Sequence, residues 1–338
     1  MMTLPPLLAL IFVAIIAFGV FMYVLLDGFD LGLGILFPFA PTNADRDTMM
    51  HSVAPVWDGN ETWLVLGAAA LFGAFPLAYG VLLSALYIPL LIMLIALVFR
   101  GIAFEFRFKS DKYRYLWDIS FSAGSLIATF SQGVALGAFI QGFAVKGSAY
   151  AGGSFDWLTP FSLMTGVALI SGYALLGATW LVMKTKGSLR EWAYAMAYRQ
   201  LAGVVFFMAA VSLATPFLES RIFERWFSWP QLAFLAPVPL AVALTSLLLL
   251  RSLRRRAELM PFLLSVFMFW LGYSGLTISV WPWLVPYAVT IGEAAAPDKT
   301  LVFMLWGFAI FIPLNLIYTA HAYWAFRGKT DAEGGYGH

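Results

Sequence analysis

The chain has 338 residues, of which 62% are hydrophobic and 11% are charged, and its mean hydropathy is +0.84. Such a composition supplies too little polar surface to cover a water-soluble globule of this size, so a polytopic membrane protein is predicted. The formal net charge is only +2 and the basic residues are dispersed among short loops, which favours neither nucleic acid nor an acidic ligand as a partner. The absence of cysteine from these residues excludes disulfides, thiolate metal sites, iron–sulfur clusters and covalently attached c-type haem.

Apolar stretches long enough to cross a membrane recur along the whole chain. A spanning helix needs roughly 20 mainly apolar residues. On that criterion nine spans are expected, at residues 7–36, 53–77, 79–100, 117–142, 158–183, 195–218, 231–250, 260–285 and 300–326. Helices joined by short loops pack as antiparallel neighbours, so the expected fold is all-α, with one or two four-helix bundles and a remaining helix.

The distribution of lysine and arginine predicts how the chain is oriented. The basic segments 100–114, 184–199 and 251–256 each follow an odd-numbered span, whereas the connections 143–157, 219–230 and 286–299 carry less positive charge. Basic loops stay in the cytoplasm, so the N-terminus is expected on the periplasmic side and the C-terminus in the cytoplasm. No removable signal peptide is expected. The Gly-rich, charged tail at 327–338 is expected to be a disordered cytoplasmic segment.

Glycines in several spans could let helix backbones approach closely. They are Gly28, Gly32, Gly124, Gly133, Gly137, Gly166 and Gly172. The alternative is that membrane helices are simply rich in glycine.

Two pairs of carboxylates lie next to apolar runs. Asp27 and Asp30 close the first span, and Asp58 and Glu61 open the second, so the predicted topology places both pairs on the cytoplasmic side. The members of each pair are three residues apart and share a helix face. Carboxyl groups beside an apolar interior can take up and release protons. The alternative is that they cap helices or lie at the membrane interface, since negative charge is favoured in a first helical turn.

The inner end of the third span carries further charge. Arg100 directly follows the apolar run and could pair with a carboxylate of a neighbouring helix, and Glu105 could relay a proton inward. Basic residues at this place are also expected as topological anchors, and Arg107 and Lys109 are interpreted only in that way.

Histidine is too scarce for this chain to hold several haems. The three histidines are His51 in a loop, His321 in the ninth span and His338 at the end of the sequence. One intramembrane histidine cannot supply the axial ligands of several b-type haems. No spaced cluster of histidine and glutamate predicts a metal site either.

Four segments together resemble subunit II of the cytochrome bd-type quinol oxidases, and the similarity extends over essentially the whole chain. They are Asp-Gly-Phe-Asp-Leu-Gly-Leu-Gly at 27–34, Ala-Pro-Val-Trp-Asp-Gly-Asn-Glu-Thr-Trp-Leu at 54–64, Phe-Arg-Gly-Ile-Ala-Phe-Glu-Phe-Arg at 99–107 and Tyr-Thr-Ala-His-Ala-Tyr-Trp at 318–324. The compact length and the Asn-Glu-Thr-Trp form resemble the cyanide-insensitive branch of that family.

The resemblance implies a complex in the bacterial inner membrane that oxidises quinol and reduces dioxygen to water. Subunit I would carry two b-type haems and one d-type haem, and this chain would ligate none. The implied fold is two four-helix bundles plus a peripheral helix. A structural quinone in a groove of this chain, a small accessory subunit and contacts with membrane lipid are further expectations.

The resemblance also implies a cytoplasmic proton pathway along the subunit interface. By motif matching it would include Asp58, Glu105 and Asp30, with Trp57 and Asn60 positioning its cytoplasmic end. Arg100, Asp27 and Glu61 would support it. Glu61 and His321 depart from what many members carry at these positions, and they stay unassigned.

Two other classes of function fit the same residues. A secondary transporter or cation channel could use these carboxylates to bind a coupling ion, and it would have broken helices near the bilayer midplane and an inverted repeat. A purely structural membrane scaffold would tolerate substitution of the carboxylates without loss of activity.

Overall fold

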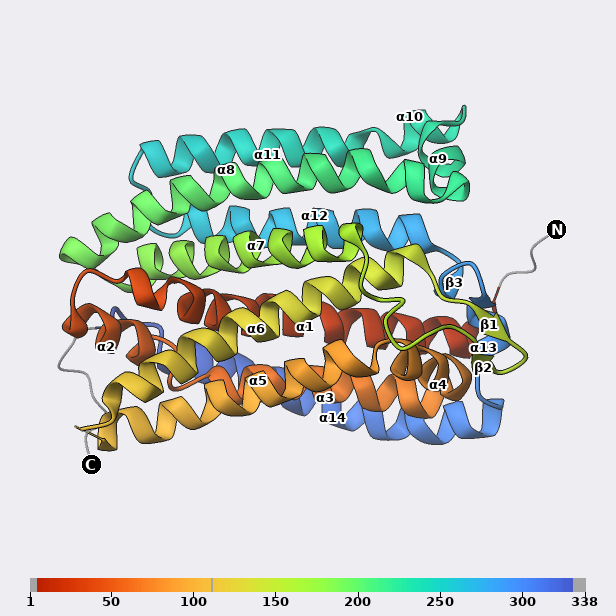
Figure 1. Ribbon diagram of the computed structural model, residues 1–338, viewed down its shortest axis with the longest axis horizontal. Helices are drawn as coiled ribbons and strands as arrows, with labels where there is room; N and C mark the ends of the chain where they lie inside the picture. The colour runs from red at the N-terminus through yellow and green to blue at the C-terminus, as the bar shows by residue number, and fades with distance from the viewer. Residues whose placement is uncertain (1–4, 111, 331–338) are drawn as a thin grey trace.

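The computed structural model describes residues 5–110 and 112–330. Long helices run side by side along the long axis of the molecule, joined by short helices and two small antiparallel hairpins (Figure 1). The helices are α1 (Leu7–Leu36), α2 (Asn43–His51), α3 (Trp57–Ala74), α4 (Pro76–Ala85), α5 (Tyr87–Phe106), α6 (Arg114–Gln141), α7 (Pro160–Lys184), α8 (Gly187–Leu218), α9 (Ser220–Phe227), α10 (Gln231–Leu235), α11 (Pro237–Arg254), α12 (Met260–Val280), α13 (Ile291–Ala294) and α14 (Asp298–Ala325). The 3₁₀ turns are η1 (Phe37–Phe39) and η2 (Arg107–Lys109), and the strands are β1 (Val145–Lys146), β2 (Ala149–Tyr150), β3 (Trp283–Val285) and β4 (Val289–Thr290).

Eight helical segments in the described part of the chain are long and apolar enough to cross a membrane. They contain α1, α5, α6, α7, α8, α11, α12 and α14. The 18-residue helix α3 lies among them, packed on α1 and α14, but its first turns hold polar residues that lower its hydropathy. The predicted all-α architecture is confirmed.

The third expected span, 79–100, differs from the observed helices. The chain forms the short helix α4 up to Ala85 and then the longer α5, which begins at Tyr87 and continues to Phe106. Proline disfavours helical geometry in the residue before it, and Phe75 before Pro76 has φ −139° and ψ 62°. The reversal between α3 and α5 therefore includes α4, at the right-hand end of the molecule in Figure 1.

The loops rich in lysine and arginine lie at one end of the molecule, and the loops with less positive charge lie at the other. The segments 100–114, 184–199 and 251–256 have their loop residues at the left-hand end in Figure 1, together with α2. The hairpins, α4, α9, α10 and α13 lie at the right-hand end. The first helix begins at the right-hand end and α14 finishes at the left-hand end. Basic loops therefore share one end, which we call the basic end.

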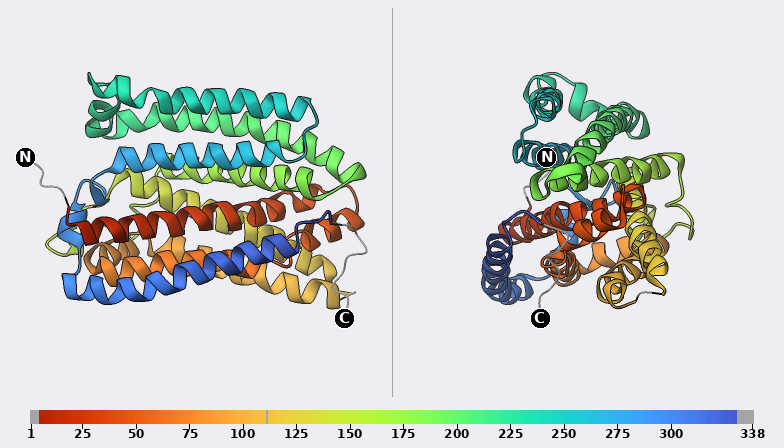
Figure 2. Two further views of the ribbon diagram at one scale, coloured as in Figure 1. Left: turned by 180° about the vertical axis from the view of Figure 1, so that it is seen from behind. Right: turned by 90° about the vertical axis from the view of Figure 1, so that its left-hand side faces the viewer.

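The long helices pack in two neighbouring sets (Figure 2). In one, α1 packs on α3 and α6, and α5 packs on α6. In the other, α8 contacts α7 and α11, and α12 contacts α7 and α11. Helix α7 also packs on α1 and α6, which joins the sets, while α14 contacts α3 and α1 from outside. The core therefore lies along α1, α6 and α7.

Close backbone contacts at glycine hold this core together. A Cβ atom added at Gly32 in α1 would lie 1.9 Å from the backbone oxygen of Tyr173 in α7, and one added at Gly133 in α6 would lie 2.5 Å from that of Thr165. The expectation of close helix approach is confirmed at these positions. Gly172 faces a side chain instead, since its added Cβ would lie 2.9 Å from the Phe269 ring.

Residues 327–330, the described part of the tail, lie against the end of α7. The ammonium group of Lys184, at the end of α7, donates to the backbone oxygens of Phe326 and Gly328, the latter at 2.7 Å. The amide of Thr330 donates to the Lys184 oxygen at 2.8 Å. The buried amine needs acceptors, and the chain after α14 supplies them. Residues 331–338 lie outside the described residues.

Candidate functional site

The centre of the candidate site is Arg100, a fully buried arginine in α5 that bridges three helices. Its Nη2 atom donates to Asp27 Oδ1 of α1 at 2.7 Å and to Glu61 of α3. The Trp57 ring lies 5.5 Å from the guanidinium carbon, a cation–π contact that suits a desolvated cation. The prediction that Arg100 pairs with a carboxylate of a neighbouring helix agrees with this geometry.

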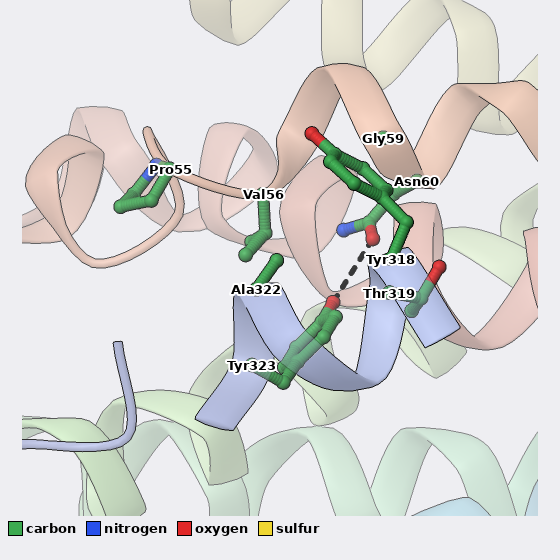
Figure 3. Close-up of a pocket in the computed structure, with 8 residues that line it drawn as sticks. All are labelled: Pro55, Val56, Gly59, Asn60, Tyr318, Thr319, Ala322 and Tyr323. Carbon is green, nitrogen blue, oxygen red and sulfur yellow. Dashed lines mark hydrogen bonds between the residues drawn. The ribbon is translucent and has the colours of Figure 1, made fainter. Parts of the chain in front are cut away.

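Asp30 lies beside this bridge, and its contact is to a neutral amide. Asn60 Nδ2 donates to Asp30 Oδ2 at 2.7 Å and to the backbone oxygen of Leu26 at 3.3 Å. The hydroxyl of Tyr323, from α14, donates to Asn60 Oδ1 at 3.0 Å (Figure 3). We call Asp27, Asp30, Asn60, Glu61 and Arg100 the buried ion cluster.

Helical spacing explains how short segments supply this cluster. Asp27 and Asp30 are three residues apart in α1, so both point toward α3 and α5. Asn60 and Glu61 are adjacent in α3 and therefore point in different directions, one toward Asp30 and the other toward Arg100. The motifs recognised in the sequence are the places where α1, α3 and α5 carry polar groups inward.

Two buried tyrosine hydroxyls and a half-buried glutamine amide form a hydrogen-bonded chain that approaches Asp27. The Tyr173 hydroxyl of α7 donates to Gln132 Oε1 of α6 at 2.8 Å, and Gln132 Nε2 donates to the Tyr23 hydroxyl of α1 at 2.7 Å. Tyr23 precedes Asp27 by one helical turn. These three residues were not predicted from the sequence, in which the only sign of them is a glutamine within an apolar helix.

Asp58 and Glu105 lie apart from the cluster, on the molecular surface. Asp58 is exposed at the start of α3. The Glu105 side chain is 65% exposed and its contact is Lys109, at 3.4 Å. Within residues 5–110 and 112–330, no hydrogen bond joins either carboxylate to the buried ion cluster. The structure therefore brings Asp27, Asp30, Asn60, Glu61, Trp57 and Arg100 together and leaves these two outside.

A small cavity lies next to Asn60, between α3 and α14 (Figure 3). The space open to water is about 10 Å³, which is room for about one molecule. It is lined by Pro55, Val56, Gly59, Asn60, Tyr318, Thr319, Ala322 and Tyr323. The hydroxyl of Thr319 is buried and has no hydrogen-bond partner among the described residues, so the cavity offers polar groups as well as room.

A larger, apolar groove of about 340 Å³ lies on α5, α6 and α7, away from the ion cluster. It is lined by Pro89, Ile92, Leu126, Ile127, Phe130, Ser131, Val134, Trp157, Val167 and Ile170. Its lining suits a hydrocarbon chain rather than a charged ligand.

A second ionic group fixes the basic end of the molecule. Arg107, expected only as an anchor, is 1% exposed and pairs with Asp47 at 2.6 Å and Asp118 at 2.5 Å. Arg114 also pairs with Asp47. Partial burial acts to raise the pKa of Asp47, but hydrogen bonds from Arg114 and Arg107 outweigh it and hold the pKa below its usual range. These pairs tie α2 to η2, which directly follows α5, and to α6.

The two described histidines have ordinary packing contacts. His51 stacks on Phe108 with ring centres 4.7 Å apart, and exposed His321 lies 6.0 Å from the Trp324 ring. In the part of the chain that the structure describes, no three His, Cys, Asp or Glu side chains are grouped to hold a metal ion.

The arrangement defines a class of protein: a polytopic helical membrane protein in which one cation is shared among buried carboxyl groups. Three carboxyl groups and one arginine leave negative charge that protons, water or a cation can offset. Such a cluster can hold an exchangeable proton.

Comparison with known proteins places the chain within this class. Residues 8–326 match the sequence model of the family described as cytochrome bd terminal oxidase subunit II. The chain is 30% identical to cytochrome bd ubiquinol oxidase subunit 2 of Bacillus subtilis, over 95% of both chains. It is 28% identical to cytochrome bd-I ubiquinol oxidase subunit 2 of Escherichia coli, over 91% of both.

The fold has also been seen in an oxidase structure. The bd oxidase from Geobacillus thermodenitrificans contains a chain that matches with a TM-score of 0.75, over 95% of this chain and 97% of that one, at 18% sequence identity. The chain belongs to the cytochrome bd terminal oxidase subunit II family. This confirms the prediction, made from the sequence motifs, of a subunit of a bd-type quinol oxidase, an oxidoreductase complex. A secondary transporter or channel is a different class, and that alternative is set aside.

Proposed function

We propose that this chain stabilises a haem-bearing subunit I and contributes a path by which cytoplasmic protons reach the site where dioxygen is reduced to water. Its relatives are subunits of ubiquinol oxidases, and the complex is proposed to oxidise a quinol. Water formation consumes protons. If these come from the cytoplasm while quinol releases its protons on the other side, a transmembrane potential forms without a pump.

The buried ion cluster is the observation that carries this proposal. Burial of charged groups in a membrane protein is costly, and such groups commonly mark ion or proton pathways. Asp27, Asp30 and Arg100 are each 0% exposed. They lie in the C-terminal halves of α1 and α5, and both of these helices end at the basic end of the molecule.

The surface carboxylates supply the proposed route from the cytoplasm. Asp58 is exposed on α3, next in sequence to Gly59 and Asn60, and Asn60 contacts Asp30. Glu105 is exposed at the end of α5. We propose that subunit I covers this surface, so that Asp58 and Glu105 receive protons at the interface and Asp30 holds one inside.

The proposed membrane arrangement is that of the sequence analysis. Helix α3 would complete nine spans, with α1, α3, α5 and α6 in one four-helix bundle, α7, α8, α11 and α12 in the other, and α14 peripheral. The basic end would face the cytoplasm of a bacterial inner membrane, by the distribution of positive charge.

The cofactors of the complex are proposed to lie mainly in the partner. Subunit I would hold two b-type haems and one d-type haem. A structural quinone would lie in the apolar groove on α5, α6 and α7, whose volume of about 340 Å³ and apolar lining fit part of an isoprenoid tail. A small accessory subunit remains an expectation.

The test is Asp58→Asn in the complete complex. The amide of the variant cannot take up and release a proton as the carboxylate does. Quinol-dependent oxygen consumption should therefore fall several-fold, while the haem spectrum should remain that of the wild type. Glu191→Gln is the matched control, because Glu191 is an exposed acid that pairs with Arg256 in another part of the molecule. Turnover that is unchanged in Asp58→Asn would remove Asp58 from the path and favour a structural role.

A further inference from the structure

The three carboxyl groups of the buried ion cluster do not have equivalent partners. Arg100 donates to Asp27 and Glu61. Its Nε and Nη1 atoms have no hydrogen-bond partner among the described residues. A single guanidinium therefore compensates two carboxylates, and a third ionised group in the same place would add uncompensated negative charge.

Asp27 Oδ2, like Asp30 Oδ1, has no hydrogen-bond partner among the described residues, but the Tyr23 hydroxyl is close to the Asp27 carboxylate. The hydrogen bonds from Tyr173 to Gln132 and from Gln132 to Tyr23 run in one direction. Because the Tyr23 oxygen accepts from Gln132, its own hydrogen is left to donate, and Asp27 is the carboxylate one turn further along α1. Glu61 differs again, since its side chain is 29% exposed and can be partly hydrated.

Asp30 has neither of these advantages. It is fully buried, it receives one hydrogen bond, and the donor is the uncharged amide of Asn60. Its Oδ1 atom has no partner among the described residues. An ionised carboxylate in this place would lose its hydration and gain few hydrogen bonds to replace it. A neutral carboxylic acid needs only an acceptor for its hydrogen.

The orientation of the Asn60 amide is fixed from both sides. The Leu26 oxygen is an acceptor and requires the NH₂ group of Asn60 on its side, 3.3 Å away. The Tyr323 hydroxyl contacts Asn60 Oδ1 and can donate to it. Tyr323 therefore keeps the NH₂ group directed at Asp30, and α14 is held in place near its end by Lys184.

We propose that Asp30 is the protonated acid of the cluster while Asp27 and Glu61 are ionised, and that Tyr323 is a positioning residue that holds Asn60 against it. The charged and titratable groups around Asp30 are Asp27 on its own helix, Glu61 on α3, Arg100 on α5 and Tyr323 on α14. The inference rests on the proposed function in one respect: the proton on Asp30 is taken to exchange along the proposed proton path.

Infrared spectroscopy of the purified complex with subunit I, in H₂O and in D₂O, tests the assignment. A protonated carboxyl group has a carbonyl band that shifts on deuteration. Asp30→Asn should remove one such band, and Asp27→Asn should retain it. The band remaining at full intensity in Asp30→Asn would overturn the assignment.

The role of Tyr323 is tested in the same spectrum. Tyr323→Phe deletes one oxygen atom and preserves the ring, so it tests the proposal even if Asp30→Asn fails to assemble. The Asp30 band should shift in frequency in Tyr323→Phe and stay in place in Tyr318→Phe, a control from the same helix whose ring lines the same cavity. An unshifted band in Tyr323→Phe would overturn the positioning role.

Turnover separates this inference from the proposed function. If Asp30→Asn loses the band but consumes oxygen and takes up protons at the wild-type rate, the protonation assignment stands and the proton-path role of Asp30 fails.

Discussion

At the scale of single residues, Arg100 is the group on which the others depend. Because it is shared by Asp27 and Glu61, its removal would leave the fully buried Asp27 and the partly exposed Glu61 without their cation. Breaking a buried pair by removing one partner costs about 3–5 kcal/mol. We therefore expect Arg100→Gln to lower the thermal unfolding midpoint of the complex and its yield from membranes.

A double variant distinguishes charge from shape in this experiment. Arg100→Gln combined with Asp27→Asn removes one stranded carboxylate with the cation, so it should recover part of the lost stability. If the stability lost by the double variant equals the sum of the losses in the two single variants, Arg100 and Asp27 are not coupled and the electrostatic explanation is wrong.

Sequence could predict only some of these residues. A polar group beside an apolar run is visible in sequence, which is why Asp27, Asp30, Glu61 and Arg100 were considered together. Partners that are distant in sequence are not visible: Tyr323 meets Asn60 across 263 positions and Gln132 meets Tyr23 across 109. Whether Asp58 is exposed and Asp30 buried depends on the angle at which helices pack, which apolar patterns do not determine.

At the scale of helices, the contact between α1 and α7 is the most restrictive. An added Cβ at Gly32 would clash with the backbone of Tyr173, which cannot move aside as a flexible side chain can. Overpacking costs typically about 1–3 kcal/mol, and more where backbone must shift. Gly32→Ala should therefore reduce thermal stability of the complex, as measured by the loss of its haem spectrum on heating.

Gly80 provides the matched control for this substitution. A Cβ added there meets nothing within 4 Å, and alanine is the better helix former. Gly80→Ala should be neutral or slightly stabilising. Equal thermal stability of the Gly32→Ala and Gly80→Ala complexes would show that α1 and α7 can move apart without loss of stability.

The helices themselves were largely predictable because long apolar runs determine them, as for α6, α7, α12 and α14. The reversal at α4 was not. Residues 76–106 form an almost unbroken apolar stretch, so hydropathy gives no sign that the first part forms the short helix α4 and the second part the long helix α5. The contact between Lys184 and the segment after α14 was not predicted, because a segment rich in glycine and charge is typical of disorder. The buried ammonium group of Lys184 binds backbone oxygens of this segment, which the sequence pattern does not reveal.

At the scale of the whole molecule, the gathering of basic loops at one end predicts the orientation in the membrane. The chain contains no cysteine, so single cysteines report accessibility without background. Ser188 at the basic end and Ser148 in the β1–β2 hairpin are both exposed and lie at opposite ends. In intact spheroplasts, a membrane-impermeant maleimide should label Ser148→Cys and leave Ser188→Cys unlabelled until the membrane is opened. The reverse pattern would invert the proposed topology.

Synthesis delivers the members of the Arg100 bridge to the membrane at different times. Asp27 is made 73 residues before Arg100, and Glu61 is made 39 residues before it. A charged side chain inside a lone spanning helix costs up to roughly 3 kcal/mol. We therefore expect α1 and α3 to lack the cation of their carboxylates until α5 has been made. Arg100 therefore supplies the cation of Asp27 and Glu61 only after both of their helices have been made.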